Sequence, residues 1–160
     1  MPAPGNRWFV DESYVKVAGR WRYLYRAVDQ FGQVIDVLVS EQRDTGAARR
    51  FFTRALAHAP APAEVTTDRA AAYLKGIDEL VPAARHISER YENNRIEADH
   101  GRLKARPRPM RGLKRLRSTM VVAAGHAFVR NLRRGCYELA IGVPAQLRLA
   151  SAFDELAQAV

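Results

Sequence analysis

The sequence has only one cysteine, Cys136, among its 160 residues. A single cysteine cannot form an intramolecular disulfide and argues against a metal site built from cysteine ligands. No apolar run approaches the roughly 20 residues that a membrane-spanning helix needs, and the N-terminus shows no charged-then-apolar leader. These absences predict a cytoplasmic protein with no membrane partner, whose length suits one domain with a substantial core.

Acidic residues are also absent between Gly101 and Arg134, a stretch that contains eleven basic residues. The net charge of +9 comes entirely from beyond position 100, because residues 1–100 contain fourteen basic and fourteen acidic residues. This asymmetry favours a surface that binds a polyanion. A solvated basic helix face is the alternative interpretation.

The first forty residues have the pattern of β-strands. Val10, Val15 and Val17 are strand formers, and a turn signal at Gly19 is followed by aromatic residues that alternate with arginine and leucine. Gly32 marks a second turn before the apolar stretch 34–39. We therefore predict three consecutive antiparallel strands.

The remainder of the sequence alternates between helical and strand patterns. Thr45 is expected to cap an amphipathic helix that ends before Pro60, and 64–68 is expected to be a short strand. A helix, another short strand, a helix over 91–104 and further helices follow. The expected fold class is α/β: three antiparallel strands, then two shorter strands, in one mixed sheet flanked by helices.

Three acidic residues stand out by position. Asp11 follows the apolar "WFV" within the first strand, Asp68 ends the strand "VTT", and Glu97 belongs to the helical stretch "YENNRIEADHGRLK". An acid in or at the end of a core strand is costly unless it is paired or binds a cation, and carboxylates suit Mg²⁺ or Mn²⁺. Seventeen acids offer many such triples, however, and Asp11 and Asp68 also fit as caps of strand ends. Glu12, next to Asp11, is expected on the other sheet face as a surface charge.

Three stretches carry a more specific signal: "VDESYVKVAGRWRYLYRAVDQFG", "TTDRAAAY" and "YENNRIEADHGRLK". From about Trp8 to about Arg134 the sequence resembles the catalytic domain of bacterial insertion-sequence transposases of the IS6 family. That family belongs to the transposases and retroviral-type integrases that carry an Asp-Asp-Glu (DDE) triad on a ribonuclease H-like fold. The three motifs occur here in the family order and with similar separations.

The resemblance implies that Asp11, Asp68 and Glu97 are the catalytic triad and hold two Mg²⁺ or Mn²⁺ ions. It implies metal-dependent cleavage of DNA at the element end, followed by transfer of the 3′-hydroxyl to a target phosphodiester. Lys104 matches a basic position of the family, two turns beyond Glu97, and His100 is a further candidate DNA contact. The other candidate DNA contacts are Arg102, Arg106, Arg108, Arg111, Lys114, Arg115 and Arg117. The expected partners are element ends and target DNA, and the expected assembly is a homo-oligomer, most simply a dimer.

One departure from the family concerns the N-terminus, where relatives carry a DNA-binding region and this sequence opens with the first strand. We divide the chain into a disordered segment (1–7), a catalytic domain (8–140) and a C-terminal helical tail (141–160). Two alternatives to an active transposase core stay open: a catalytically inactive remnant that only binds DNA, and a ribonuclease H-like nuclease that cuts RNA–DNA hybrids. We expect a bacterial cytoplasmic protein that associates with the nucleoid when bound to DNA.

Overall fold

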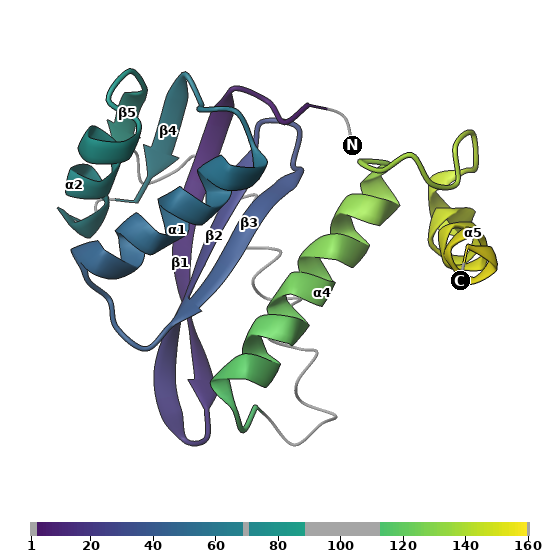
Figure 1. Cartoon of the computed structure of the whole chain (residues 1–160), viewed down its shortest axis with the longest axis horizontal. Coiled ribbons are helices and arrows are strands. Elements are labelled where there is room, and N and C mark those ends of the chain that lie inside the picture. Colours follow the sequence, from purple (N-terminus) through teal and green to yellow (C-terminus); the bar gives the residue numbers. More distant parts are fainter. Residues whose placement is uncertain (1–2, 69–70, 89–112, 160) are drawn as a thin grey trace.

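A five-stranded mixed sheet forms the centre of the molecule (Figure 1). The computed structural model describes residues 3–68, 71–88 and 113–159. The strands lie in the order β3-β2-β1-β4-β5. β1 pairs antiparallel with β2, and β2 with β3, whereas β4 is parallel to both β1 and β5. The bounds are β1 Arg7–Val17, β2 Arg20–Asp29, β3 Val34–Ser40, β4 Glu64–Thr67 and β5 Arg85–Ser88.

Two tight turns connect the first three strands. Ala18 and Gly19 both have positive φ angles, 50° and 78°, which is the conformation of a two-residue hairpin turn that matches the strand twist. At the second turn, Gly32 has a φ of 82°, and the carboxylate of Asp29 accepts hydrogen bonds from the backbone N–H groups of Phe31 and Gln33. The prediction of three consecutive antiparallel strands is confirmed.

Helix α1, Thr45–His58, begins one residue away from where the sequence suggested. The N-cap is Asp44, whose carboxylate accepts a hydrogen bond from the backbone N–H of Ala47 at 2.7 Å, so the prediction of Thr45 as the cap is wrong. Asp and Thr are both good caps, and here the extended backbone lies at Asp44. The helix ends before Pro60 as predicted, since a proline disfavours helical backbone in the residue that precedes it.

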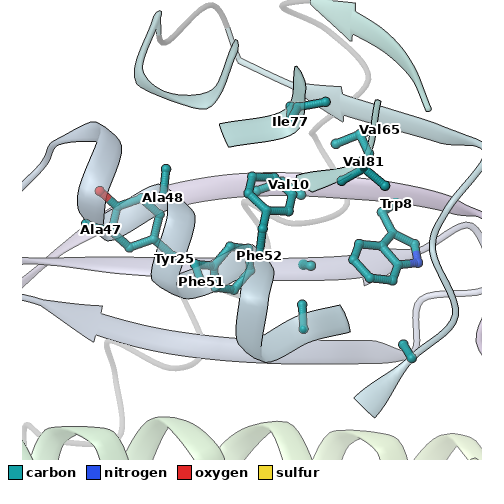
Figure 2. Packing of buried hydrophobic residues seen from close by; sticks show 13 residues of the cluster. Trp8, Val10, Tyr25, Ala47, Ala48, Phe51, Phe52, Val65, Ile77 and Val81 are labelled. Carbon is teal, nitrogen blue, oxygen red and sulfur yellow. The ribbon is translucent and has the colours of Figure 1, made fainter. Parts of the chain in front are cut away.

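One face of the sheet is covered by α1 and by α2, Ala71–Leu80. The fully buried residues Trp8, Val10 and Tyr25 point from the sheet toward Phe51 and Phe52 of α1 (Figure 2). Burying one side chain of this size contributes about 1.5–3 kcal/mol. This cluster fixes the position of β1 between its two neighbours.

The opposite face is covered by α4, Leu116–Arg134. Its Ala123 and Met120 pack on the strand residues whose side chains point away from α1, among them Phe9 and Leu24. Near its C-terminus, Asn131 binds the backbone of β3 twice, accepting from the Val34 N–H at 2.7 Å and donating to the Val34 carbonyl at 2.8 Å. Hence α4 is fastened along the β3 side of the sheet.

The last helix, α5 (Ala145–Gln158), packs against α4 away from the sheet (Figure 1). Gly135, with a φ of 75°, ends α4 and lets the chain turn back. Cys136, just beyond this turn, is buried. The helix that the sequence predicts over 91–104 lies outside the described residues. Across the described part of the chain, no helix has the length and apolarity to cross a membrane.

Candidate active site

Asp11 and Asp68 lie at the point where the parallel pairing of β1 and β4 ends. The last pair in register is Val10 with Thr67. Continued by one residue, this register places Asp68 opposite Asp11. Neighbouring strands are about 4.8 Å apart, and opposed residues of parallel strands point to the same face. Two acids that are 57 positions apart in the sequence therefore directly follow the last paired residues of two neighbouring strands.

The Asp68 carboxylate suits a cation. Its Oδ1 atom is buried and has no hydrogen-bond partner in the described part of the structure. A buried carboxylate oxygen without a partner costs free energy, which a bound hard cation would offset. Paired carboxylates of this type are ligands that Mg²⁺ and Mn²⁺ prefer, so the residues present fit such an ion.

Asp11 has a different environment. Its side chain is buried, and its Oδ1 atom accepts a hydrogen bond from the Glu12 backbone N–H at 2.8 Å. Its direct partner across the antiparallel pair is Arg26 of β2, which is 1% exposed. Burial, together with the nearby charge of Arg130 on α4, lowers the pKa of Arg26 to about 9, although Asp11 opposes this shift. Arg26 therefore stays protonated near neutral pH, beside the Asp11 carboxylate.

Glu12 points to the opposite face of the sheet, as predicted, but it is not a surface charge. Its side chain is only 5% exposed and forms an ion pair with Arg43, in the segment that leads into α1. This negative charge also contributes, after burial, to raising the pKa of Tyr25 to about 12. The expectation fails because Arg43, remote in sequence, covers this position.

Most of the other predicted site residues lie outside the described part of the chain. Glu97, His100, Arg102, Lys104, Arg106, Arg108 and Arg111 all belong to the stretch 89–112. Lys114, Arg115 and Arg117 are described and exposed, at the start of α4. Among the described residues no three His, Cys, Asp or Glu side chains form a metal-binding group. Of the three predicted acids, the described residues include Asp11 and Asp68, and Glu97 lies outside them.

Two residues that the sequence analysis did not single out are Arg26, the partner of Asp11 on β2, and Arg130, whose charge acts on Arg26. Arg26 follows the apolar "YLY" within β2, and Arg130 lies on α4 near it. A cation inside an apolar strand is as unusual as an acid there. The position of Arg26 within the strand could therefore have identified it from the sequence. Arg130 gave no signal beyond its place in a basic stretch.

The sheet order and the helices on both faces define a class of protein. Solved structures of similar fold include the integrase catalytic core domain of HTLV-2 in complex with magnesium, in a dimeric form, with a TM-score of 0.60 and 13% identity over 94% of this chain and 98% of that one. They also include a simian T-cell lymphotropic virus intasome in complex with the PP2A regulatory subunit B56 gamma, with a TM-score of 0.66 and 16% identity over 94% and 56%. The fold is ribonuclease H-like, as the integrase cores are.

Sequence relatives narrow the class to a family. Residues 5–136 match the model of a family described as a DDE domain. Staphylococcus aureus transposases of the insertion sequence-like element IS431mec and of the insertion sequence IS257 in transposon Tn4003 are each 32% identical over 119 residues, 71% of this chain. The chain belongs to the DDE transposases of the IS6 family, which are polynucleotidyl transferases, and corresponds to their catalytic core. It spans about half the length, 53%, of these curated relatives.

Proposed function

We propose that this chain cleaves DNA and transfers strands by two-metal phosphoryl transfer, with Asp11, Asp68 and Glu97 as the metal-binding triad. The observation that supports the proposal is the register of β1 and β4, whose last pair, Val10 with Thr67, comes directly before Asp11 and Asp68. The partnerless Oδ1 atom of Asp68 supports the same role. Glu97 enters from the family resemblance, through the motif "NNRIEADH".

Asp11 and Asp68 each have a definite task in this proposal. Bound Mg²⁺ or Mn²⁺ ions supply Lewis acidity at the attacking and leaving oxygens of the phosphodiester. Asp11, in the middle of a long strand, would hold a metal ion with a carboxylate whose cross-strand neighbour is Arg26. Asp68 offers an oxygen that makes no competing hydrogen bond among the described residues.

The substrate we propose is DNA, at element ends and at targets. The described cations Lys114, Arg115 and Arg117 are exposed in a segment that contains no acid. Lysine and arginine that contact phosphates displace counterions, so the affinity for duplex DNA should fall steeply with salt. A flat salt response, measured by fluorescence anisotropy, would contradict a basic phosphate-binding surface.

The direct test of the reaction is the substitution Glu97→Gln. We expect it to abolish nicking and strand transfer with Mg²⁺ or Mn²⁺ while the melting temperature stays within the range of the unchanged protein. Asp99→Asn is the matched control, because a helical wheel places Asp99 roughly opposite Glu97. Full metal-dependent activity of Glu97→Gln would overturn the proposed reaction. Salt-dependent DNA binding without cleavage under either ion would instead favour a remnant that only binds DNA.

We also propose that the chain acts as a homodimer. The support is the family resemblance, together with the dimeric form in which the HTLV-2 integrase core was solved. The molar mass in solution, measured by light scattering with and without DNA, tests this. A monomer under both conditions would contradict it.

A further inference from the structure

The β1–β2 hairpin extends beyond the rest of the sheet. β3 pairs with β2 only from Tyr23 onward, and β4 pairs with β1 only as far as Val10. The segment 15–22 is therefore a two-stranded ribbon, which projects past the end of β3 (Figure 1). A ribbon of this width is one of the two elements that the major groove of B-form DNA admits.

The ribbon is basic. The sequence has no acid from Ser13 to Val28. Lys16 and Arg20 are exposed, and neither forms an ion pair with an acid in the described part of the chain. Arg22 is different, since it forms an ion pair with Glu41 at 3.2 Å. Within the described residues, no acid compensates the positive charges of Lys16 and Arg20 at the tip.

A second basic segment, residues 114–117, follows a residue that is hydrogen-bonded to the same tip. The backbone N–H of Ala18 donates to the carbonyl of Leu113 at 2.7 Å, and Val17 forms a β-bridge with Leu113. Lys114, Arg115 and Arg117 follow directly, all exposed, and the first turn of α4 contains no acid. The positive end of the α4 dipole adds to this potential. Cations from two distant parts of the sequence consequently lie at the same end of the β1–β2 hairpin.

The tip also has an exposed aromatic side chain. Trp21 is 61% exposed, and the Lys16 ammonium lies 5.7 Å from its ring centroid. An exposed tryptophan among lysines and arginines is typical of nucleic-acid surfaces, where the ring packs on sugars or bases while the cations bind phosphates.

We propose that the ribbon tip, residues 16–22, together with residues 114–117, is a second DNA-binding surface that takes a flanking B-form duplex. The inference rests on the proposed function, because it presupposes a DNA substrate at Asp11 and Asp68. Val17 lies six positions after Asp11 in β1, which is about 20 Å along the strand. At 3.4 Å per base step, the ribbon contacts the duplex about six base pairs from the reacting phosphate. It anchors and orients the DNA without taking part in the chemistry.

The test compares two double variants of the full chain, both of which remove two exposed positive charges. Lys16→Gln with Arg20→Gln alters the ribbon, and Lys75→Gln with Arg85→Gln alters α2 and β5 at the other side of the sheet. Binding of a long fluorescein-labelled duplex of random sequence is measured over a salt series. We expect the ribbon variant to lower the slope of log affinity against log salt by about 2 and to weaken binding about tenfold or more near 0.1 M salt. The control pair should match the unchanged protein.

Trp21 provides a second readout. The chain has two tryptophans, and Trp8 is fully buried, so quenching by acrylamide reports Trp21. Saturating duplex should protect this emission, and the quenchable component should be missing in Trp21→Phe. If the ribbon variant binds like the control and duplex leaves Trp21 unprotected, the inference is overturned, while the proposed function stands because the unchanged protein still binds DNA. If the unchanged protein binds no duplex at all, both fail together.

Discussion

Asp11 and Arg26 are direct partners across the antiparallel pair β1–β2, and both are buried on the face that α4 covers. Arg130 of α4 adds a second positive charge near Arg26. The buried guanidinium therefore balances a carboxylate that, in the proposed reaction, also binds a metal ion. The two cations, one from the protein and one from solution, then act on the same acid.

Substituting Arg26 with methionine tests this relationship. We expect Arg26→Met to lower the free energy of unfolding by about 3 kcal/mol in EDTA, because it leaves a buried carboxylate without its neighbouring cation. The loss should be smaller with excess Mg²⁺, since the ion supplies positive charge at Asp11. Urea denaturation under both conditions measures the difference. Arg85→Met, at an exposed position of β5, is the control, and an equal loss of stability in EDTA and in Mg²⁺ would contradict the coupling.

Asp68→Asn should have the opposite effect on stability. Its Oδ1 atom has no described partner to lose, so the melting temperature in EDTA should stay unchanged or rise. Stabilisation by Mg²⁺ should disappear, because it depends on binding to the folded state. Metal-dependent cleavage should fall by at least about a hundredfold, which corresponds to losing a few kcal/mol of transition-state stabilisation.

Thermal shift and titration calorimetry with MgCl₂ measure the metal part of this prediction. Asp154→Asn, an exposed acid on α5, serves as the matched control and should keep the response to Mg²⁺. A response of Asp68→Asn equal to that of the control would remove Asp68 from the metal site.

The attachment of α4 to the sheet depends on Asn131. Asn131→Ala should cost about 3 kcal/mol of unfolding free energy, because it leaves the buried N–H and carbonyl of Val34 without partners. Asn131→Asp keeps an oxygen that accepts from the Val34 N–H. It loses the N–H group that donates to the Val34 carbonyl and places a negative charge beside that carbonyl. Arg133→Ala, exposed on the same helix, is the control. A loss at Asn131 no larger than at Arg133 would show that these two bonds do not hold the helix.

His86 should make stability depend on pH. Its Nε2 atom lies 2.7 Å from the Thr67 Oγ1 atom, and burial lowers the pKa of His86 below 6.5, against a smaller opposing effect of Asp78. A folded-state pKa below the unfolded value means that the unfolded chain binds more protons in this interval. The contribution is therefore fully present above pH 6.5 and is lost as the pH falls through the folded-state pKa.

Urea denaturation over a pH series checks this sign. His86→Gln should flatten the decline below pH 6.5, whereas His58→Gln, which removes an exposed imidazole, is the matched control. If His86→Gln and the unchanged protein lose the same stability as the pH falls, protonation of His86 does not cause the pH dependence.

The strands were predictable because their signals are local. Alternating side chains and two turns that require positive φ specify the first three strands, and a two-residue turn at Ala18–Gly19 already makes Asp11 and Arg26 partners when counted outward. The cap of α1 was predicted one residue late, since Asp44 and Thr45 have equivalent chemistry and only the backbone decides between them.

The candidate site was predictable in part. Apolar strand patterns pointed to Asp11 and Asp68, but the pairing of their strands depends on a parallel register between segments separated by β2, β3 and α1, which no local pattern encodes. The same limit applies to Glu12, because its partner Arg43 comes from a separate segment. The role of Glu97 stays a prediction from the family motif.

The central claim is that three carboxylates share one metal centre, and a crystal structure of the chain with Mn²⁺, located by its anomalous signal, tests it most directly. The account predicts bound ions with oxygen atoms of Asp11, Asp68 and Glu97 each about 2.0–2.3 Å from an ion. Manganese bound elsewhere, or any one of these three carboxylates turned away from the ions, would contradict it.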